Sequence, residues 1–225
     1  MVRNEFSKKI SIVGFLLCTT SFAVKCSDAE RLQSSQPPIV LGIAYDVSGS
    51  MFKNKNTVLQ TTHIDSLISI VKLKGGALAF GLIHDQSFEP LIRLSLEPVT
   101  GRLDERAQKN RKNKGAITQF RSSLSTLLSQ PRKSRYTDIH GALERFTLLF
   151  NEPGFPVDSK KLFLFLSDGL HDQRRKIYQA VKFPENVTVV AVGLKSKIAL
   201  KLFKGKILQF ESVDAAVSYI MRMEN

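Results

Sequence analysis

The sequence predicts an α/β fold with a mostly parallel central sheet, one antiparallel edge strand and helices on both faces. Apolar runs of strand length alternate with segments of helical periodicity, which is typical of parallel strands joined by crossover helices. The run at residues 187–192 is apolar almost throughout, as expected for a strand that is covered on both sides. The chain of 225 residues is long enough to bury one substantial core.

The first half of the chain supplies three predicted strands. The apolar run at residues 39–45 is the first, and a helix at residues 57–74 follows it with an apolar stripe at helical spacing. Residues 77–84 form the second strand, and the alternating segment 91–97 forms a half-exposed third. The connection at residues 85–90 is short enough for a hairpin and too short for a parallel crossover, so the third strand is antiparallel.

The second half continues the alternation of helices and strands. Gly and Pro residues punctuate it, for example around Gly154 and Pro156. The expected helices are residues 100–129, 139–150, 173–181, 197–203 and 213–223, and the expected strands are residues 161–167, 186–193 and 206–210.

The N-terminus has the pattern of a secretory signal. Basic residues precede an apolar stretch at residues 10–23, which is short for a membrane span and ends in a small-x-small cleavage pattern. We interpret residues 1–23 as a signal peptide, 24–37 as a tether and 38–225 as the folded domain. The protein is therefore expected to be exported to a periplasm, a cell envelope or the extracellular space. An uncleaved N-terminal anchor is the alternative.

The two cysteines do not form a disulfide framework in the mature chain. Cys18 lies inside the predicted signal, so cleavage leaves Cys26 alone. Cys26 is either an ordinary surface thiol or a site of lipid attachment, for which the preceding Lys25 is a poor fit. A lipid on Cys26, or an uncleaved signal, would associate the protein with a membrane.

Positive charge is concentrated in one segment. The chain has 33 basic and 20 acidic residues, and residues 102–135 hold ten Lys or Arg against two acids. This segment is either a solvated helix face or a patch for anionic partners, and we do not expect nucleic acid to meet an exported protein. The candidate partner-binding residues are Arg111, Lys112, Lys114, Arg132, Lys133 and Arg135.

An oxygen-rich cluster follows the first strand. Asp46, Ser48 and Ser50 occupy alternate positions, so in extended chain their side chains point the same way. One carboxylate and two hydroxyls are ligands that suit a hard cation such as magnesium or calcium. Asp, Ser and Gly are also common in ordinary turns, so this motif alone leaves both interpretations open.

Two distant stretches strengthen the metal interpretation. Thr137 and Asp138 stand directly before a predicted helix, and Asp168 follows another predicted strand within a Ser-Asp-Gly sequence. In open α/β sheets, ligands bind outside the carboxyl ends of the strands, which is where Asp46 and Asp168 are expected. In this order, the three pieces resemble the metal-ion-dependent adhesion site of a von Willebrand factor A-type domain.

This resemblance implies a Rossmann-like fold and a bound cation, Mg²⁺ first, with Mn²⁺ or Ca²⁺ as alternatives. It implies direct coordination by serine hydroxyls, a ligand from Thr137 in some states, and two acids that supply charge. It also implies a partner protein that offers an Asp or Glu carboxylate. The implied metal residues are Asp46, Ser48, Ser50, Thr137 and Asp168. From the residues themselves, Asp138 is expected to cap the following helix rather than to bind the metal.

The sequence lacks the familiar enzyme motifs. We find no nucleophile elbow, His-Glu-x-x-His pair, phosphate loop or Gly-x-Gly-x-x-Gly fingerprint. We therefore expect an exported, non-enzymatic, metal-dependent protein-binding module. The alternative is a cell-envelope assembly or scaffold component that binds anionic partners through residues 102–135 and uses the metal only structurally.

Overall fold

The structure, a computed structural model, describes residues 36–48, 51, 55–85, 87, 89–129, 137–170, 184, 186–195, 203 and 207–224. The predicted signal peptide, Cys26 and most of the tether lie outside these residues. The strands are β1 (Ile39–Asp46), β2 (Gly76–Ile83), β3 (Ile92–Leu96), β4 (Lys160–Leu166), β5 (Val187–Val192) and β6 (Ile207–Phe210). The helices are the short 3-10 helix η2 (Lys55–Thr57) and the α-helices α2 (Thr61–Lys74), α3 (Leu103–Ser129), α4 (Ile139–Phe150) and α6 (Val213–Glu224).

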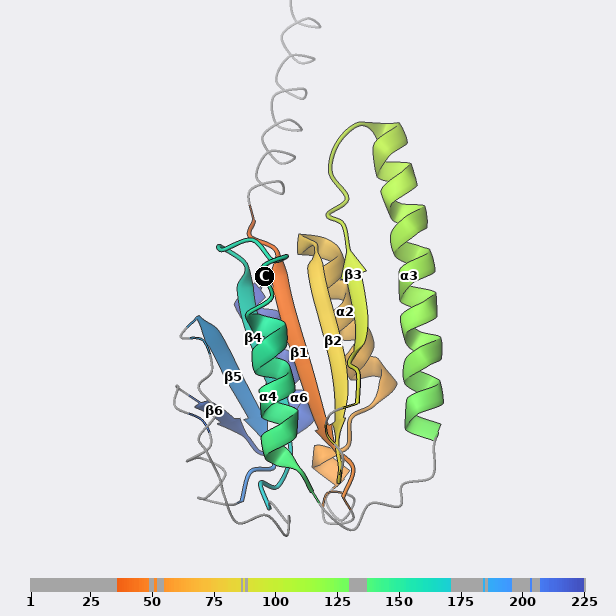
Figure 1. The fold of residues 1–225 in the computed structure, drawn as a ribbon. Coiled ribbons are helices and arrows are strands. Elements are labelled where there is room, and N and C mark those ends of the chain that lie inside the picture. Colours follow the sequence, from red (N-terminus) through yellow and green to blue (C-terminus); the bar gives the residue numbers. More distant parts are fainter. Residues whose placement is uncertain are drawn as a thin grey trace, which may run out of the picture. The chain divides into compact units, whose positions relative to one another are not determined.

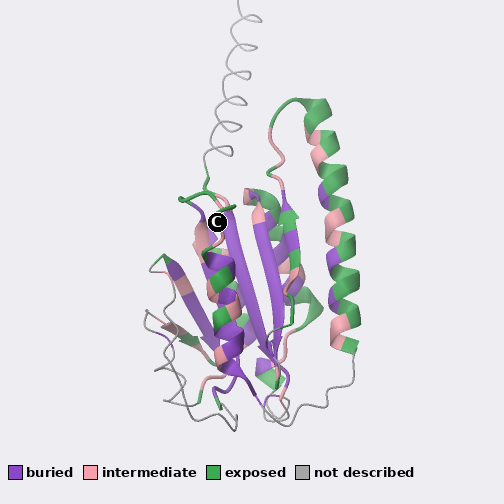
Figure 2. Ribbon diagram, in the orientation of Figure 1, coloured by how far each residue is buried: buried purple, intermediate pink, exposed green. Residues whose placement is uncertain are grey.

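The strands form one sheet in the order β3-β2-β1-β4-β5-β6 (Figure 1). All neighbouring pairs are parallel except β2 and β3, which are antiparallel. This arrangement confirms the predicted fold class, including the antiparallel edge strand. β1 lies between β2 and β4, and Figure 2 shows these three strands buried along almost their whole length.

Two apolar cores lie on opposite faces of the sheet. Alternate residues of β1 divide between them, with Leu41 and Ile43 in one core and Val40 and Ala44 in the other. Helices α2 and α6 cover the first face, and α4 covers the second (Figure 1). Gly42 permits the close approach of α4, since a Cβ there would lie 2.8 Å from the ring of Phe146.

Helix α2 begins four residues later than the sequence predicts. Thr57, the predicted first residue, lies in η2, and its hydroxyl donates to the carbonyl of Met51 at 3.1 Å. The N-cap is Gln60, whose backbone N–H donates to Nδ1 of His63 at 3.0 Å in a capping box. Hydrogen bonds of these side chains determine where α2 starts, and the spacing of apolar residues in the sequence does not reveal them.

The other described boundaries agree with prediction within a few residues, and α4 occupies the predicted range. The predicted helix at residues 173–181 lies outside the described residues, as does the helix at 197–203 apart from the buried Phe203. The structure contains no helix in its described part that is long and apolar enough to cross a bilayer.

A buried carboxylate fixes the end of the last helix. Glu224 is 3% exposed, and its two carboxylate oxygens lie 2.5 Å from the ammonium nitrogens of Lys74 and Lys160. These partners belong to the end of α2 and the start of β4. One acid therefore joins three elements at the amino end of the parallel strands.

We predict that Glu224→Ala destabilises the protein by about 3 kcal/mol, because it leaves two poorly solvated ammonium groups without their counter-charge. Chemical denaturation should measure this loss. Glu211→Ala is the matched control, since Glu211 is exposed and should change stability by less than about 0.5 kcal/mol. Equal effects of the two substitutions would show that the three-residue cluster contributes nothing specific.

Candidate metal centre

The three sequence pieces meet at the carboxyl edge of the parallel strands. Asp46, the last residue of β1, pairs with Ile83 at the end of β2. On the other side Tyr45 pairs with Leu166, so Ser167 and Asp168 directly follow the last pair of β1 and β4. The pairing of three adjacent strands therefore positions the two acids. Neither acid depends on a long loop for its place.

Asp46 is buried and held on both carboxylate oxygens. It is 0% exposed, its Oδ1 accepts from the Ser48 backbone N–H at 2.8 Å, and its Oδ2 accepts from the Ser167 hydroxyl at 2.7 Å. Burial raises the pKa of Asp46, and the nearby charge of Asp168 raises it further, while the bonds from Ser167 and Ser48 oppose both effects. Because burial disfavours the ionised form, a positive charge beside Asp46 would stabilise it.

Asp168 is fixed by the turn that follows β4. It is 4% exposed, and its Oδ1 accepts from the Leu170 backbone N–H at 3.0 Å. Its own carbonyl accepts from the Lys195 N–H at 3.0 Å, which ties the turn to the residues after β5. Gly169 has a φ of 75°, a conformation that favours glycine, so the Ser-Asp-Gly sequence suits this turn.

Thr137 and Asp138 reach the same edge from the loop before α4. Both are buried, and the Asp138 N–H donates to the carbonyl of His84, directly after β2, at 2.8 Å. The Asp138 carboxylate accepts from the Gly141 N–H at 2.9 Å as the N-cap of α4. The predicted capping role of Asp138 is therefore confirmed. Thr137, one residue earlier, stands beside the end of β2.

The structure describes one of the two predicted serine ligands, Ser48. Ser48 is partly buried, and its carbonyl accepts from the Met51 N–H at 3.2 Å. Ser50 lies outside the described residues. The structure thus gathers Asp46, Ser48, Thr137 and Asp168 at one edge of the sheet, as the sequence predicts.

Ser167 is a residue of this edge that the sequence reasoning did not single out. Its hydroxyl donates to Asp46 and accepts from the Gly169 N–H at 3.0 Å. It therefore links the two acid-bearing segments and closes the turn around Asp168. The available signal was its position between a buried strand and an acid, but a serine there is also an ordinary turn residue.

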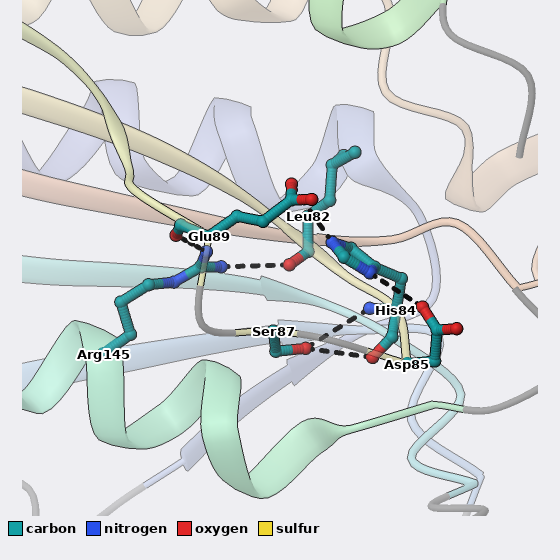
Figure 3. Close-up of polar contacts among 6 residues, drawn as sticks. All are labelled: Leu82, His84, Asp85, Ser87, Glu89 and Arg145. Carbon is teal, nitrogen blue, oxygen red and sulfur yellow. Dashed lines mark hydrogen bonds and ion pairs between the residues drawn. The ribbon is translucent and has the colours of Figure 1, made fainter.

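A second network holds the loop beside Thr137 and Asp138 (Figure 3). The ring nitrogens of His84 lie 3.1 Å from Asp85 Oδ1 and 3.4 Å from Glu89 Oε2. The Ser87 hydroxyl donates to the His84 carbonyl at 3.1 Å and accepts from the His84 N–H at 3.3 Å. Because the same carbonyl accepts from Asp138, this loop supports the position of the neighbouring Thr137.

Arg145 of α4 holds the loop after β2 through two backbone carbonyls. Its guanidinium donates to the carbonyl of Glu89 and, at 3.0 Å, to the carbonyl of Leu82 (Figure 3). Burial lowers the pKa of Arg145 to about 10, although Glu89 and Asp138 oppose this shift. Gly81 leaves room for the guanidinium, since a Cβ there would lie 2.5 Å from one of its nitrogens.

The donor set fits a hard cation better than a transition metal. Across the described residues, no group of three His, Cys, Asp or Glu side chains could hold a metal ion. Any ion at this edge would therefore depend on hydroxyl and water oxygens in addition to Asp46 and Asp168. Oxygen ligands of this kind suit magnesium, which usually keeps several waters. The shared burial of two acids also favours a positive charge between them.

The basic partner candidates lie elsewhere. Lys112 forms an ion pair with Glu97, which follows the end of β3, and β3 ends opposite Gly76 at the amino end of β2. Arg111, Lys112 and Lys114 therefore sit near the sheet edge opposite Asp46. Three further candidates lie outside the described residues: Arg132, Lys133 and Arg135.

Comparison with known proteins adds structural neighbours only. No family model matches the chain, and no curated protein matches it. The chain is similar to proximal thread matrix protein 1 from the mussel byssus, with 16% identity, a TM-score of 0.47 and coverage of 84% of this chain. It is also similar to the pilus adhesin SpaC from Lactobacillus rhamnosus GG in an open conformation, with 14% identity, a TM-score of 0.43 and coverage of 85% of this chain.

The chain spans 47% of the thread matrix protein and 30% of the pilus adhesin. Both TM-scores are below 0.5, so neither similarity decides what this chain does.

We predict that Ser167→Ala destabilises the protein by about 1–3 kcal/mol, because the Gly169 N–H and one oxygen of Asp46 lose their partner. The pKa of Asp46 should rise further, since the Ser167 hydroxyl holds it down. Thermal unfolding and NMR titration of Asp46 measure the two effects. Ser123→Ala, on an exposed face of α3, is the control. An unchanged pKa in Ser167→Ala would contradict the role given to this hydroxyl.

Proposed function

We propose that this protein is a metal-dependent protein-binding module that captures a carboxylate of a partner. The observation that carries the proposal is the buried pair of acids, Asp46 and Asp168, brought to one sheet edge by adjacent parallel strands. Ser48 and Thr137 stand at the same edge and add neutral oxygens. Ser50 would add another, and it belongs to the same sequence motif.

The division between charged and neutral ligands determines what such a site can do. Asp46 and Asp168 together carry two negative charges, which balance a divalent cation. The hydroxyls of Ser48, Ser50 and Thr137 contribute oxygen without charge. When bound, the cation would supply an attractive field and an open coordination position for an acidic oxygen from outside. Mg²⁺ is the first choice, and Mn²⁺ or Ca²⁺ could replace it.

The surroundings of the acids favour binding over catalysis. The oxygens of Asp46 are occupied by Ser48 and Ser167, and Asp138 is occupied as a helix cap. Both ring nitrogens of His84, on the neighbouring loop, face carboxylates. We therefore propose a non-enzymatic role. The signal-like N-terminus supports an exported protein, so the partner is expected at an envelope or outside the cell.

We predict that Mg²⁺ stabilises the wild-type protein and does not stabilise Asp46→Ala. A ligand at one hundred times its Kd adds about 2.7 kcal/mol of stability, which thermal unfolding readily detects. Asp158→Ala is the matched control, because Asp158 is exposed and precedes β4, whereas Asp168 follows the other end of that strand. It should keep the full Mg²⁺ effect. Equal stabilisation of wild type and Asp46→Ala would refute the site.

We also predict that a partner protein is retained only when both the cation and Asp46 are present. The mature chain is immobilised and exposed to an envelope extract in Mg²⁺, with and without a chelator, at low and high salt. Retention that depends on a carboxylate bound to metal should vanish with chelator at either salt and should be absent in Asp46→Ala. Retention that ignores chelator and weakens steeply with salt would instead favour the scaffold alternative.

A further inference from the structure

Helix α3 packs one face against the core and exposes the opposite face. Phe120 and Leu124 are buried in the core beside β3. Asn113 is also buried, and its side chain accepts from the Glu97 N–H at 3.1 Å and donates to the Glu97 carbonyl at 2.8 Å. These contacts determine which face of the helix points outward at the edge of the sheet (Figure 1).

The basic side chains of α3 differ in whether they pair with another described residue. Residues 109–114 contain four of them, and K/R-rich runs of this length occur in patches that bind nucleic acid or heparin. Lys109 donates to the Thr100 carbonyl, and Lys112 pairs with Glu97 at the surface. Arg111 and Lys114 are exposed, and within the described part of the chain neither side chain makes a hydrogen bond or ion pair.

Arg111 and Lys114 also line a shallow hollow on the outer face. Its volume is 570 Å³, and the other lining residues are Gly115, Thr118, Gln119, Ser122 and Ser123. A Cβ at Gly115 would have no heavy atom within 4 Å, so the floor of the hollow is open there. Along the helix, the two cations are followed by hydroxyl and amide groups, and the lining includes no aromatic or aliphatic residue.

This lining suits one class of anionic partner better than the others. The centres of specific protein interfaces are enriched in aromatic and methionine side chains, and none lines this hollow. Hydroxyl and amide groups can instead exchange hydrogen bonds with sugar hydroxyls. Arg111 and Lys114, three residues apart, lie about 5–6 Å apart at Cβ and can meet one or two oxyanions. An Arg fork binds a planar or tetrahedral oxyanion through two parallel hydrogen bonds.

The acids near this face do not cancel its charge. Glu97 is already paired with Lys112, and Lys112 lowers the pKa of Glu97, so that acid stays ionised. Asp65 of α2 is paired with Arg121. Asp104 and Glu105 lie in the first turn of the helix, where they face the positive end of its dipole.

We propose that the outer face of α3 binds a polyanionic glycan carrying sulfate or carboxylate groups, through Arg111 and Lys114. This site is independent of the metal centre. It lies near the amino end of β2, and seven residues of extended strand, about 23 Å, separate that end from the pairing partner of Asp46.

The test uses heparin as the glycan probe and the full mature chain. Its affinity is measured by titration calorimetry at several salt concentrations for wild type and for Arg111→Ala combined with Lys114→Ala. The double variant should bind about tenfold more weakly at 0.1 M salt, with a shallower salt dependence, because two counterion-releasing contacts are lost. Chelator should change nothing. Lys55→Ala combined with Lys72→Ala is the control, since both lysines are exposed and lie on other elements.

Three results would overturn the proposal. An equal loss in the control would show that only net charge matters. Poly-glutamate or duplex DNA binding as tightly as heparin, with the same dependence on Arg111 and Lys114, would show a partner that is not a glycan. Unchanged heparin affinity in the double variant would place any binding elsewhere. Thermal unfolding of both variants checks that each is folded.

Discussion

The hydrogen bond from Ser167 to Asp46 is the interaction on which the candidate site depends. It joins the ends of β4 and β1, two adjacent parallel strands, and so keeps two buried acidic segments together. Burial is the main cause of the raised pKa of Asp46, and the nearby charge of Asp168 adds to it. A positive charge placed beside these acids would offset this cost, which is the physical basis of the metal proposal.

Much of the fold could be predicted because it follows from periodicity. The apolar runs of β1 and β5 indicate directly that both faces of these strands are buried, and a short connection determines the direction of β3. The start of α2 could not be predicted, because it depends on Gln60 and His63 forming a reciprocal cap. The role of Ser167 was not apparent for a similar reason, since its partner lies 121 residues earlier.

The order of the motifs along the chain was enough to predict that four of the candidate residues lie together. Asp46, Ser48, Thr137 and Asp168 reach one edge because parallel strands and the loop before α4 end there. The sequence could not show that Arg145 supports the loop after β2, because Arg145 bonds the backbone carbonyls of Leu82 and Glu89, which any residue type provides. The proposed metal centre lies at the carboxyl ends of the central strands, and the proposed glycan site lies on α3 beside β3. The protein could therefore bind a carboxylate partner and a glycan at once.

Anomalous scattering from crystals grown with Mn²⁺ would show whether a cation binds between Asp46 and Asp168, because it locates the ion without assuming its ligands. We expect one strong peak at the carboxyl ends of β1 and β4, beside the hydroxyl of Ser48 and the carboxylates of Asp46 and Asp168. A peak elsewhere on the chain, or no ordered ion at millimolar Mn²⁺, would contradict it.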